Sequence, residues 1–172
     1  MSGIKERSRE VWGKVTGGLE SGMDQAQADL GRLQEQAAKA PDASKAHIHA
    51  KIGETHAKQE ADQEKLRSNL AAEVAEDDLQ IAQLEAAAAG VSGDAHGKIV
   101  HDIDQVRAER DKAHQKLVNN LEAEVAEIEG ELTALEKAAA DAPADAAARI
   151  MARAEWARVR RDAVQGSLQA VR

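Results

Sequence analysis

The chain contains no cysteine, phenylalanine or tyrosine, and its 172 residues include only two tryptophans and two prolines. Disulfide bonds and thiolate metal ligands are therefore excluded. Aromatic side chains bury the most area per residue, so their scarcity argues against a thick globular core. The absence of cysteine favours a cytoplasmic location, because disulfide-bonded proteins belong to oxidising compartments.

Long apolar runs and an excess of basic charge are also missing. No stretch of about 18 apolar residues occurs, so we expect no membrane-spanning helix. Residues 1–22 carry charges throughout and lack the apolar segment of a secretory signal. The formal net charge of −8 argues against nucleic-acid binding, which requires cationic side chains to neutralise phosphates.

The remaining composition is mostly alanine, leucine, isoleucine and valine set among charged residues, which make up 31% of the chain. This mixture is typical of long helices and coiled coils. Alanine lets helices approach closely but buries little area per residue. The composition therefore predicts a long, narrow core.

The sequence matches itself when it is shifted by 51 residues, and it does so twice. A fixed period of this length is the mark of stacked supersecondary units. The clearest equivalent positions are Leu33, Leu84 and Leu135; Ile48, Ile99 and Ile150; and Leu66, Leu117 and Leu168. We therefore expect three tandem copies of one helical repeat.

Helix-breaking residues recur at one place in each repeat, where Pro41, Ser92 and Pro143 are equivalent. Proline starts or ends a helix, glycine permits a left-handed cap, and aspartate or serine can accept hydrogen bonds at a helix start. No comparable breaker lies between these points, and short turns favour antiparallel neighbours. The pattern predicts an all-α protein, a single elongated antiparallel bundle or coiled coil over residues 1–172. Its expected helices are 3–39, 43–89, 94–140 and 144–171.

An apolar seam with a mean spacing of about 3.6 residues follows each expected helix. On the third helix it runs through Ile99, Ile103, Val106, Arg110, Ala113, Leu117, Leu121, Val125, Ile128, Leu132, Leu135 and Ala139. From the turn centres, residue i of the second helix faces about 184 − i on the third, and residue i of the third faces about 286 − i on the fourth. The fourth helix then ends level with His114.

This alignment leaves residues 80–104 as a pair of helices without further neighbours, which we call the hairpin end. Its main apolar side chains are Ile81, Leu84, Ile99 and Ile103. An isolated helix pair buries too little to be stable alone, and each such side chain gains about 1.5–3 kcal/mol on burial. We expect a second copy of the chain to cover the hairpin end in an antiparallel homodimer, with fraying as the alternative.

Polar residues interrupt the seams at Thr55, Gln59, Asp62, Asp77, Arg110 and Arg161. We interpret them as layers that fix the register between helices, the alternative being a ligand or ion site inside the bundle. The six histidines form no Glu-x-x-His pair, and no catalytic triad or glycine-rich phosphate loop occurs. The sequence therefore predicts no catalytic residue, no cofactor and no metal site, and the protein is not expected to be an enzyme.

Charge is distributed unevenly along the chain. Residues 121–136 hold six glutamates and no basic residue, whereas residues 144–172 hold six arginines and three acids. The antiparallel alignment places these two stretches side by side, so we expect them to form ion pairs with each other. The alternative is a stripe of Arg149, Arg153 and Arg160 that binds an anionic partner.

The N-terminal stretch is mildly basic and amphipathic, with Ile4, Val11, Trp12 and Val15 as its apolar side chains. Such a helix can lie in a membrane interface. In composition the chain resembles the exchangeable apolipoproteins and the phasins of storage granules, which coat apolar surfaces with amphipathic helices. The resemblance covers composition alone and no motif. The leading hypothesis is a self-associating scaffold or spacer, and the alternative is a protein of lipid or granule surfaces.

Overall fold

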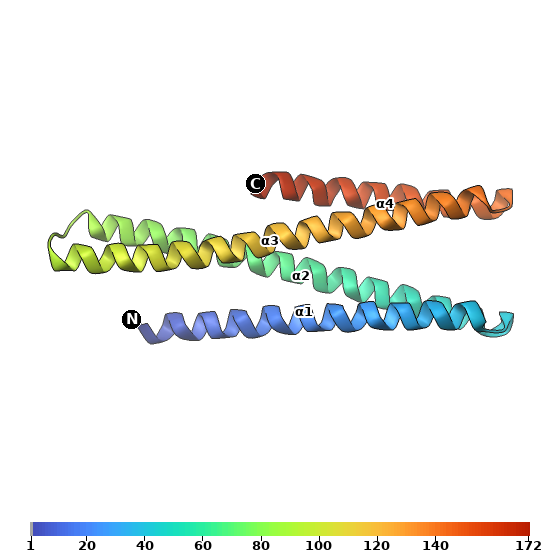
Figure 1. Cartoon of the computed structure of the whole chain (residues 1–172), viewed down its shortest axis with the longest axis horizontal. Coiled ribbons are helices and arrows are strands. Elements are labelled where there is room, and N and C mark those ends of the chain that lie inside the picture. The colour runs from blue at the N-terminus through green and yellow to red at the C-terminus, as the bar shows by residue number, and fades with distance from the viewer. Residues whose placement is uncertain (1) are drawn as a thin grey trace. The chain divides into compact units, whose positions relative to one another are not determined.

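The computed structural model describes the backbone of residues 2–172 and the side chains of residues 13–41 and 43–172. Within these residues the chain forms four helices joined by short turns and contains no strand (Figure 1). The helices are α1 (Ser2–Lys39), α2 (Asp42–Ala88), α3 (Asp94–Ala140) and α4 (Ala144–Val171). The all-α class is thereby confirmed. The contacts divide the chain into two units, Met1–Leu79 and Gln80–Arg172, and α2 contributes to both. The single elongated domain stays a prediction.

The last two turns show how the sequence ends and restarts its helices. Gly93, with a φ of 64°, occupies the N-cap position of α3 in the left-handed region that favours glycine. Pro143 opens α4, and its carbonyl accepts a hydrogen bond from the amide of Ala147 at 2.8 Å. Neither start has a side-chain cap, so the expected capping by aspartate or serine is wrong at both. Asp94 and Asp145 lie instead inside the first turns, where a carboxylate is favoured by the positive end of the helix.

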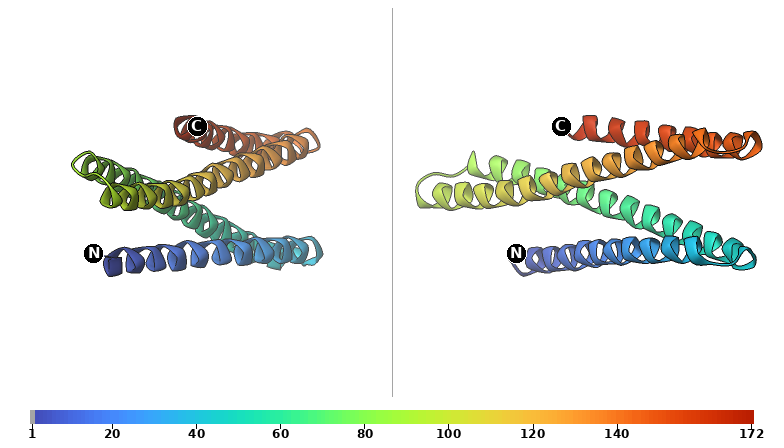
Figure 2. Two further views of the ribbon diagram at one scale, coloured as in Figure 1. Left: turned by 60° about the vertical axis from the view of Figure 1, so that its left-hand side comes forward. Right: turned by 45° about the vertical axis from the view of Figure 1, so that its right-hand side comes forward.

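The first unit is a helical hairpin of α1 and the part of α2 that follows the turn at Pro41 (Figure 2). The two helices are joined by a hydrogen bond from Gln59 Nε2 to Gln27 Oε1 at 3.0 Å. The buried apolar side chains described in this unit are Ala26, Leu30, Leu66 and Leu70. All four lie on the expected seams, so apolar spacing decides which sides of α1 and α2 turn inward.

The second unit consists of the end of α2, all of α3 and all of α4. The buried apolar residues of α3 are Ile103, Val106, Ala113, Leu117, Leu121, Ile128 and Leu132, and those of α4 are Ala154, Ala157, Val164 and Leu168. Every buried apolar residue of α3 belongs to the expected seam. At one place a residue off the seam is buried instead: Glu124 is buried, whereas the neighbouring seam residue Val125 is only half-buried.

Side-chain contacts fix the alignment of α3 with α4, which lie side by side from their shared turn (Figure 2). His114 Nε2 lies 2.6 Å from the carbonyl oxygen of Val171, so α4 ends beside His114 as expected. Farther along, Arg107 pairs with Glu85 across the turn from α2 to α3 at 2.6 Å. At positions 51 residues later, Arg158 pairs with Glu136 across the turn from α3 to α4 at 2.7 Å. The same ion pair thus fastens two successive turns.

Candidate functional site

Helix α4 carries apolar side chains on two opposite faces. Its inner face, with Ala154, Ala157, Val164 and Leu168, is buried. At about 100° per residue, Val159 lies opposite this inner face, and Met151 and Trp156 lie on either flank of Val159. All three side chains remain exposed. Met151 is 43% exposed, Trp156 53% and Val159 63%. Together with the exposed small residues Ala148, Ala152, Ala163, Gly166 and Ala170 they form what we call the outer face of α4.

Charged residues lie within the outer face and along one edge of it. Glu155 and Asp162 lie between Met151 and Val159, and Arg149 and Arg160 lie beyond Trp156 at the edge. Each acid is paired with an arginine of its own helix, Glu155 with Arg158 at 2.9 Å and Asp162 with Arg161 at 2.7 Å. Both carboxylates nevertheless remain mostly exposed.

Ion pairs between α3 and α4 occupy most of the arginines of α4. The pairs are Arg153 with Glu131 at 2.8 Å, Arg158 with Glu136 at 2.7 Å, Arg160 with Glu124 at 3.1 Å, and Arg172 with Glu122. Hydrogen bonds from Arg158 to Glu136 and Glu155 raise the pKa of the guanidinium above its usual range. The expected ion pairing of the glutamate-rich and arginine-rich stretches is therefore confirmed.

The anion-binding stripe of Arg149, Arg153 and Arg160 stays a prediction. Arg153 and Arg160 already face carboxylates of α3. Arg149 is exposed and makes no ion pair within the described residues. The structure thus leaves Arg149 as the member of the stripe best placed to meet a partner.

The hairpin end, residues 80–104, lies wholly within the second unit. Ile103 is buried at 6% exposure. The other three apolar side chains of this segment are half-buried: Ile81, Leu84 and Ile99. Val91 in the turn and Val100 on α3 are exposed beside them. The two helices therefore cover each other only in part.

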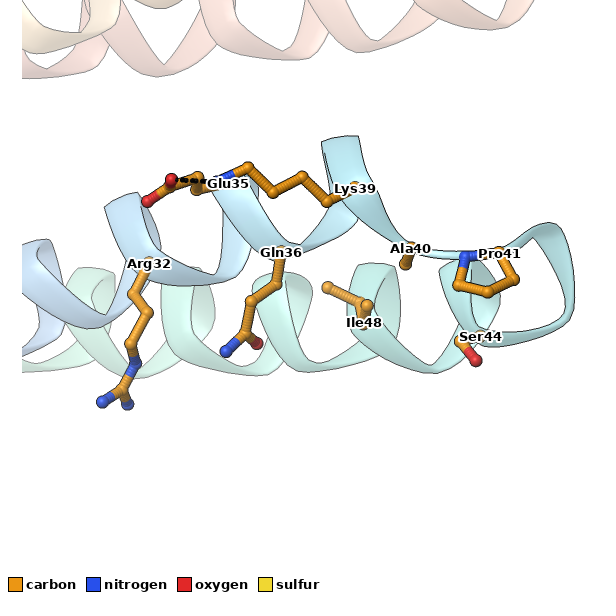
Figure 3. A pocket seen from close by; sticks show the side chains of 8 residues that line it. All are labelled: Arg32, Glu35, Gln36, Lys39, Ala40, Pro41, Ser44 and Ile48. Atoms are coloured by element: carbon orange, nitrogen blue, oxygen red, sulfur yellow. Dashed lines mark hydrogen bonds and ion pairs between the residues drawn. The ribbon is translucent and has the colours of Figure 1, made fainter.

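A shallow, open hollow of about 540 Å³ lies beside the turn between α1 and α2 (Figure 3). Its floor is apolar, with Pro41 and Ile48 among the lining residues. At its rim the ammonium of Lys39 pairs with the carboxylate of Glu35, so these two charges satisfy each other. Ligand sites usually combine enclosure with converging polar groups, and this hollow is open instead.

Within the described side chains, no three His, Asp or Glu residues gather in a way that could hold a metal ion. The histidines found in hydrogen bonds contact protein groups: His114 faces the Val171 carbonyl, and His101 lies 3.1 Å from Gln105 Nε2. Among the polar seam residues, Thr55 donates to the carbonyl of Lys51 at 2.9 Å. This is a bond within one helix turn.

The residues of the expected lipid contact are only partly described. The side chains of Ile4, Val11 and Trp12 lie outside the described residues. Val15 is 42% exposed on α1. None of the helices, over the part the structure describes, has the length and apolar character needed to cross a membrane.

The outer face of α4 is the surface that the sequence analysis missed. The seam of residues 144–171 accounts for Val164 and Leu168, whereas Met151, Trp156 and Val159 lie off it. A count of apolar residues on both sides of that helix could have found the face. In comparisons with known proteins, no family model, curated protein or solved structure matches the chain.

Proposed function

We propose that the protein is a non-catalytic structural protein whose coiled-coil-like repeats form a scaffold or spacer, and that two copies associate through their hairpin ends. The observation that carries this proposal is the incomplete cover of the hairpin end. Ile81, Leu84 and Ile99 are half-buried, and exposed valines adjoin them. Full burial of such a side chain is worth about 1.5–3 kcal/mol, so a second copy gains stability by completing their cover.

The charged groups of the second unit support a structural role. The glutamates of α3 and the arginines of α4 hold the two helices in register through pairs such as Arg153 with Glu131. The helices are also long enough to serve as spacers. With 47 residues each, α2 and α3 extend about 70 Å at 1.5 Å per residue.

The test is the oligomeric state of two matched variants of the whole chain. Leu84→Glu places a charge among the half-buried side chains of the hairpin end, whereas Gln83→Glu places it on the exposed neighbouring residue. In sedimentation velocity we expect the wild type and Gln83→Glu to form dimers. Leu84→Glu should lose association through the hairpin end and sediment as a monomer, while its circular dichroism stays helical. A Leu84→Glu variant that sediments like the wild type would contradict the proposal.

Binding to a lipid or granule surface is the second candidate, favoured by the exposure of Val15 on α1. It predicts that vesicles of anionic phospholipid shift the emission of Trp12 to shorter wavelength, measured in a Trp156→Phe variant so that only one tryptophan reports. An unchanged emission spectrum at saturating lipid would leave the scaffold as the better account.

A further inference from the structure

We infer that residues 13–22 of α1 form a detachable segment, which opens away from α2 while the rest of the first unit stays folded. The hairpin end is not involved, so the inference is independent of the proposed self-association.

The first observation is the glycine content of this segment. Four of its ten residues are glycine, at positions 13, 17, 18 and 22, whereas the stretches 51 and 102 residues later, 64–73 and 115–124, contain none. Glycine is the poorest helix former after proline, because its backbone loses the most freedom in a helix. Residues 13–22 therefore form a helix that is intrinsically weaker than the matching stretches of α2 and α3.

The usual structural requirements for glycine do not apply at these positions. Among the described residues only Gly93 has a positive φ, so the glycines of α1 are not needed for a left-handed backbone. A Cβ atom added at Gly13, Gly17 or Gly18 would meet nothing within 4 Å, so these residues are not needed for close helix packing either. Their effect on this helix is to weaken it.

The second observation is that apolar burial anchors the segment poorly. Val15 is 42% exposed, although its counterparts at the same repeat position, Leu66, Leu117 and Leu168, are 2%, 3% and 9% exposed. Because Leu168 lies in the last helix, as Val15 lies in the first, a place at the end of the helix order does not account for this difference. Leu19 is likewise only half-buried.

The side chain that residues 13–22 do bury is that of Thr16, at 4% exposure. Its hydroxyl donates to the Gly13 carbonyl of its own helix at 3.4 Å. A threonine offers little apolar surface, so its burial stabilises the closed segment less than the burial of a leucine does. Few buried apolar side chains and weak helix propensity together characterise a region that opens locally.

The following part of α1 is better anchored, which defines where the opening stops. Ala26 and Leu30 are buried at 7% and 4% exposure. Gln27 Oε1 accepts the hydrogen bond from Gln59 Nε2 of α2 at 3.0 Å. Opening thus gives the first unit two states, closed and partly open, and a partner that contacts only the open state would select it.

The opening is tested by hydrogen exchange of the whole chain, followed by mass spectrometry. We expect the amides of residues 13–22 to exchange at least about tenfold faster than those of residues 24–38, since local opening exposes only the former. Gly13→Ala, Gly17→Ala and Gly18→Ala, combined in one variant, add methyl groups into open space and should slow this exchange at least about tenfold.

The control is Gly130→Ala on α3, where the Cβ position is also open, and it should leave the exchange of residues 13–22 unchanged. Equal exchange of the two parts of α1 in the wild type, or an absence of any effect of the three alanines, would overturn the inference.

A second measurement compares two buried positions of α1, because the chain has no cysteine of its own. Thr16 and Ala26 are 4% and 7% exposed, so a static helix would protect a thiol equally well in Thr16→Cys and in Ala26→Cys. Local opening instead makes Thr16→Cys react with a thiol reagent at least about tenfold faster, and the three alanines should remove the difference. Circular dichroism checks that both variants keep the helical fold. If Ala26→Cys reacts as fast as Thr16→Cys, the whole helix opens as one and the inference of a separate segment is wrong.

Discussion

The hairpin end and the outer face of α4 are both apolar, but they differ in what already covers them. At the hairpin end, α2 and α3 turn their apolar side chains toward each other, and Ile103 is buried as a result. On α4 the inner side makes the core, and Val159 on the other side stays 63% exposed. Apolar content alone therefore does not identify an interface. The informative quantity is the apolar surface that remains after the fold has covered its own core.

Truncation of a core side chain gives the reference for both surfaces, because there we expect the largest loss in the free energy of unfolding. Leu121 is 1% exposed on α3, and Leu121→Ala removes a side chain whose space the neighbours refill only in part. The free energy of unfolding should fall by about 2–5 kcal/mol, measured by urea denaturation followed by circular dichroism. A loss below that range would mean that the α3 core is loosely packed, and the two surfaces could then not be ranked against it.

The contribution of ion pairs to the packing of α4 against α3 is tested at the most buried of these pairs. Glu124 is 4% exposed and pairs with Arg160, which is itself about one-fifth exposed. Glu124→Gln removes the carboxylate and leaves the guanidinium partly buried, so unfolding should become easier by about 1–3 kcal/mol. The more exposed pair offers the control, since Glu131→Gln should change stability by only about 0–1 kcal/mol. Equal losses in the two variants would contradict the ranking by burial.

Truncating one side chain on each apolar surface should lower the free energy of unfolding by different amounts. Leu84→Ala at the half-buried hairpin end should lower the free energy of unfolding by about 1–2 kcal/mol, because part of its side chain is already removed from water. Val159→Ala should change it by less than about 0.5 kcal/mol in the monomer, since the side chain is mostly exposed. Chemical denaturation at low protein concentration measures both. If Val159→Ala proves the more damaging, the outer face belongs to the core of a folded monomer.

A small loss of stability is also expected at the repeated ion pair. Glu85→Gln and Glu136→Gln each remove one exposed carboxylate, so each should lower stability by about 0–1 kcal/mol, and added salt should shrink the loss. Thermal unfolding in low and high salt provides the measurement. A clear difference between the two variants would show that the hairpin end and the turn before α4 are not equivalent surroundings.

The sequence predicted the course of the helices because the determining signals are local. Proline fixes its own backbone angle and glycine permits a left-handed one, so Pro41, Gly93 and Pro143 mark the turns whatever surrounds them. The seam of α3 was likewise predictable from apolar spacing alone, as the burial of Leu117 and Leu121 illustrates.

Two features were not predictable from that spacing. Glu124 is buried because Arg160 of another helix reaches it, and a seam drawn through one helix contains no information about such a partner. The outer face of α4 was missed because the seam describes only the side that faces the core. Trp156 and Val159 lie off that side, and their exposure became evident only once α4 had been placed against α3.

The ion pairs across the turns have an evolutionary consequence. In Glu85–Arg107 and again in Glu136–Arg158 the two partners are separated by 22 residues, less than half of the 51-residue shift. A tandem duplication of one such block would carry both the acid and the base, and so would supply the ion pair across the new turn. A chain of this kind can lengthen by duplication, because each copy already contains the ion pair that joins its two helices.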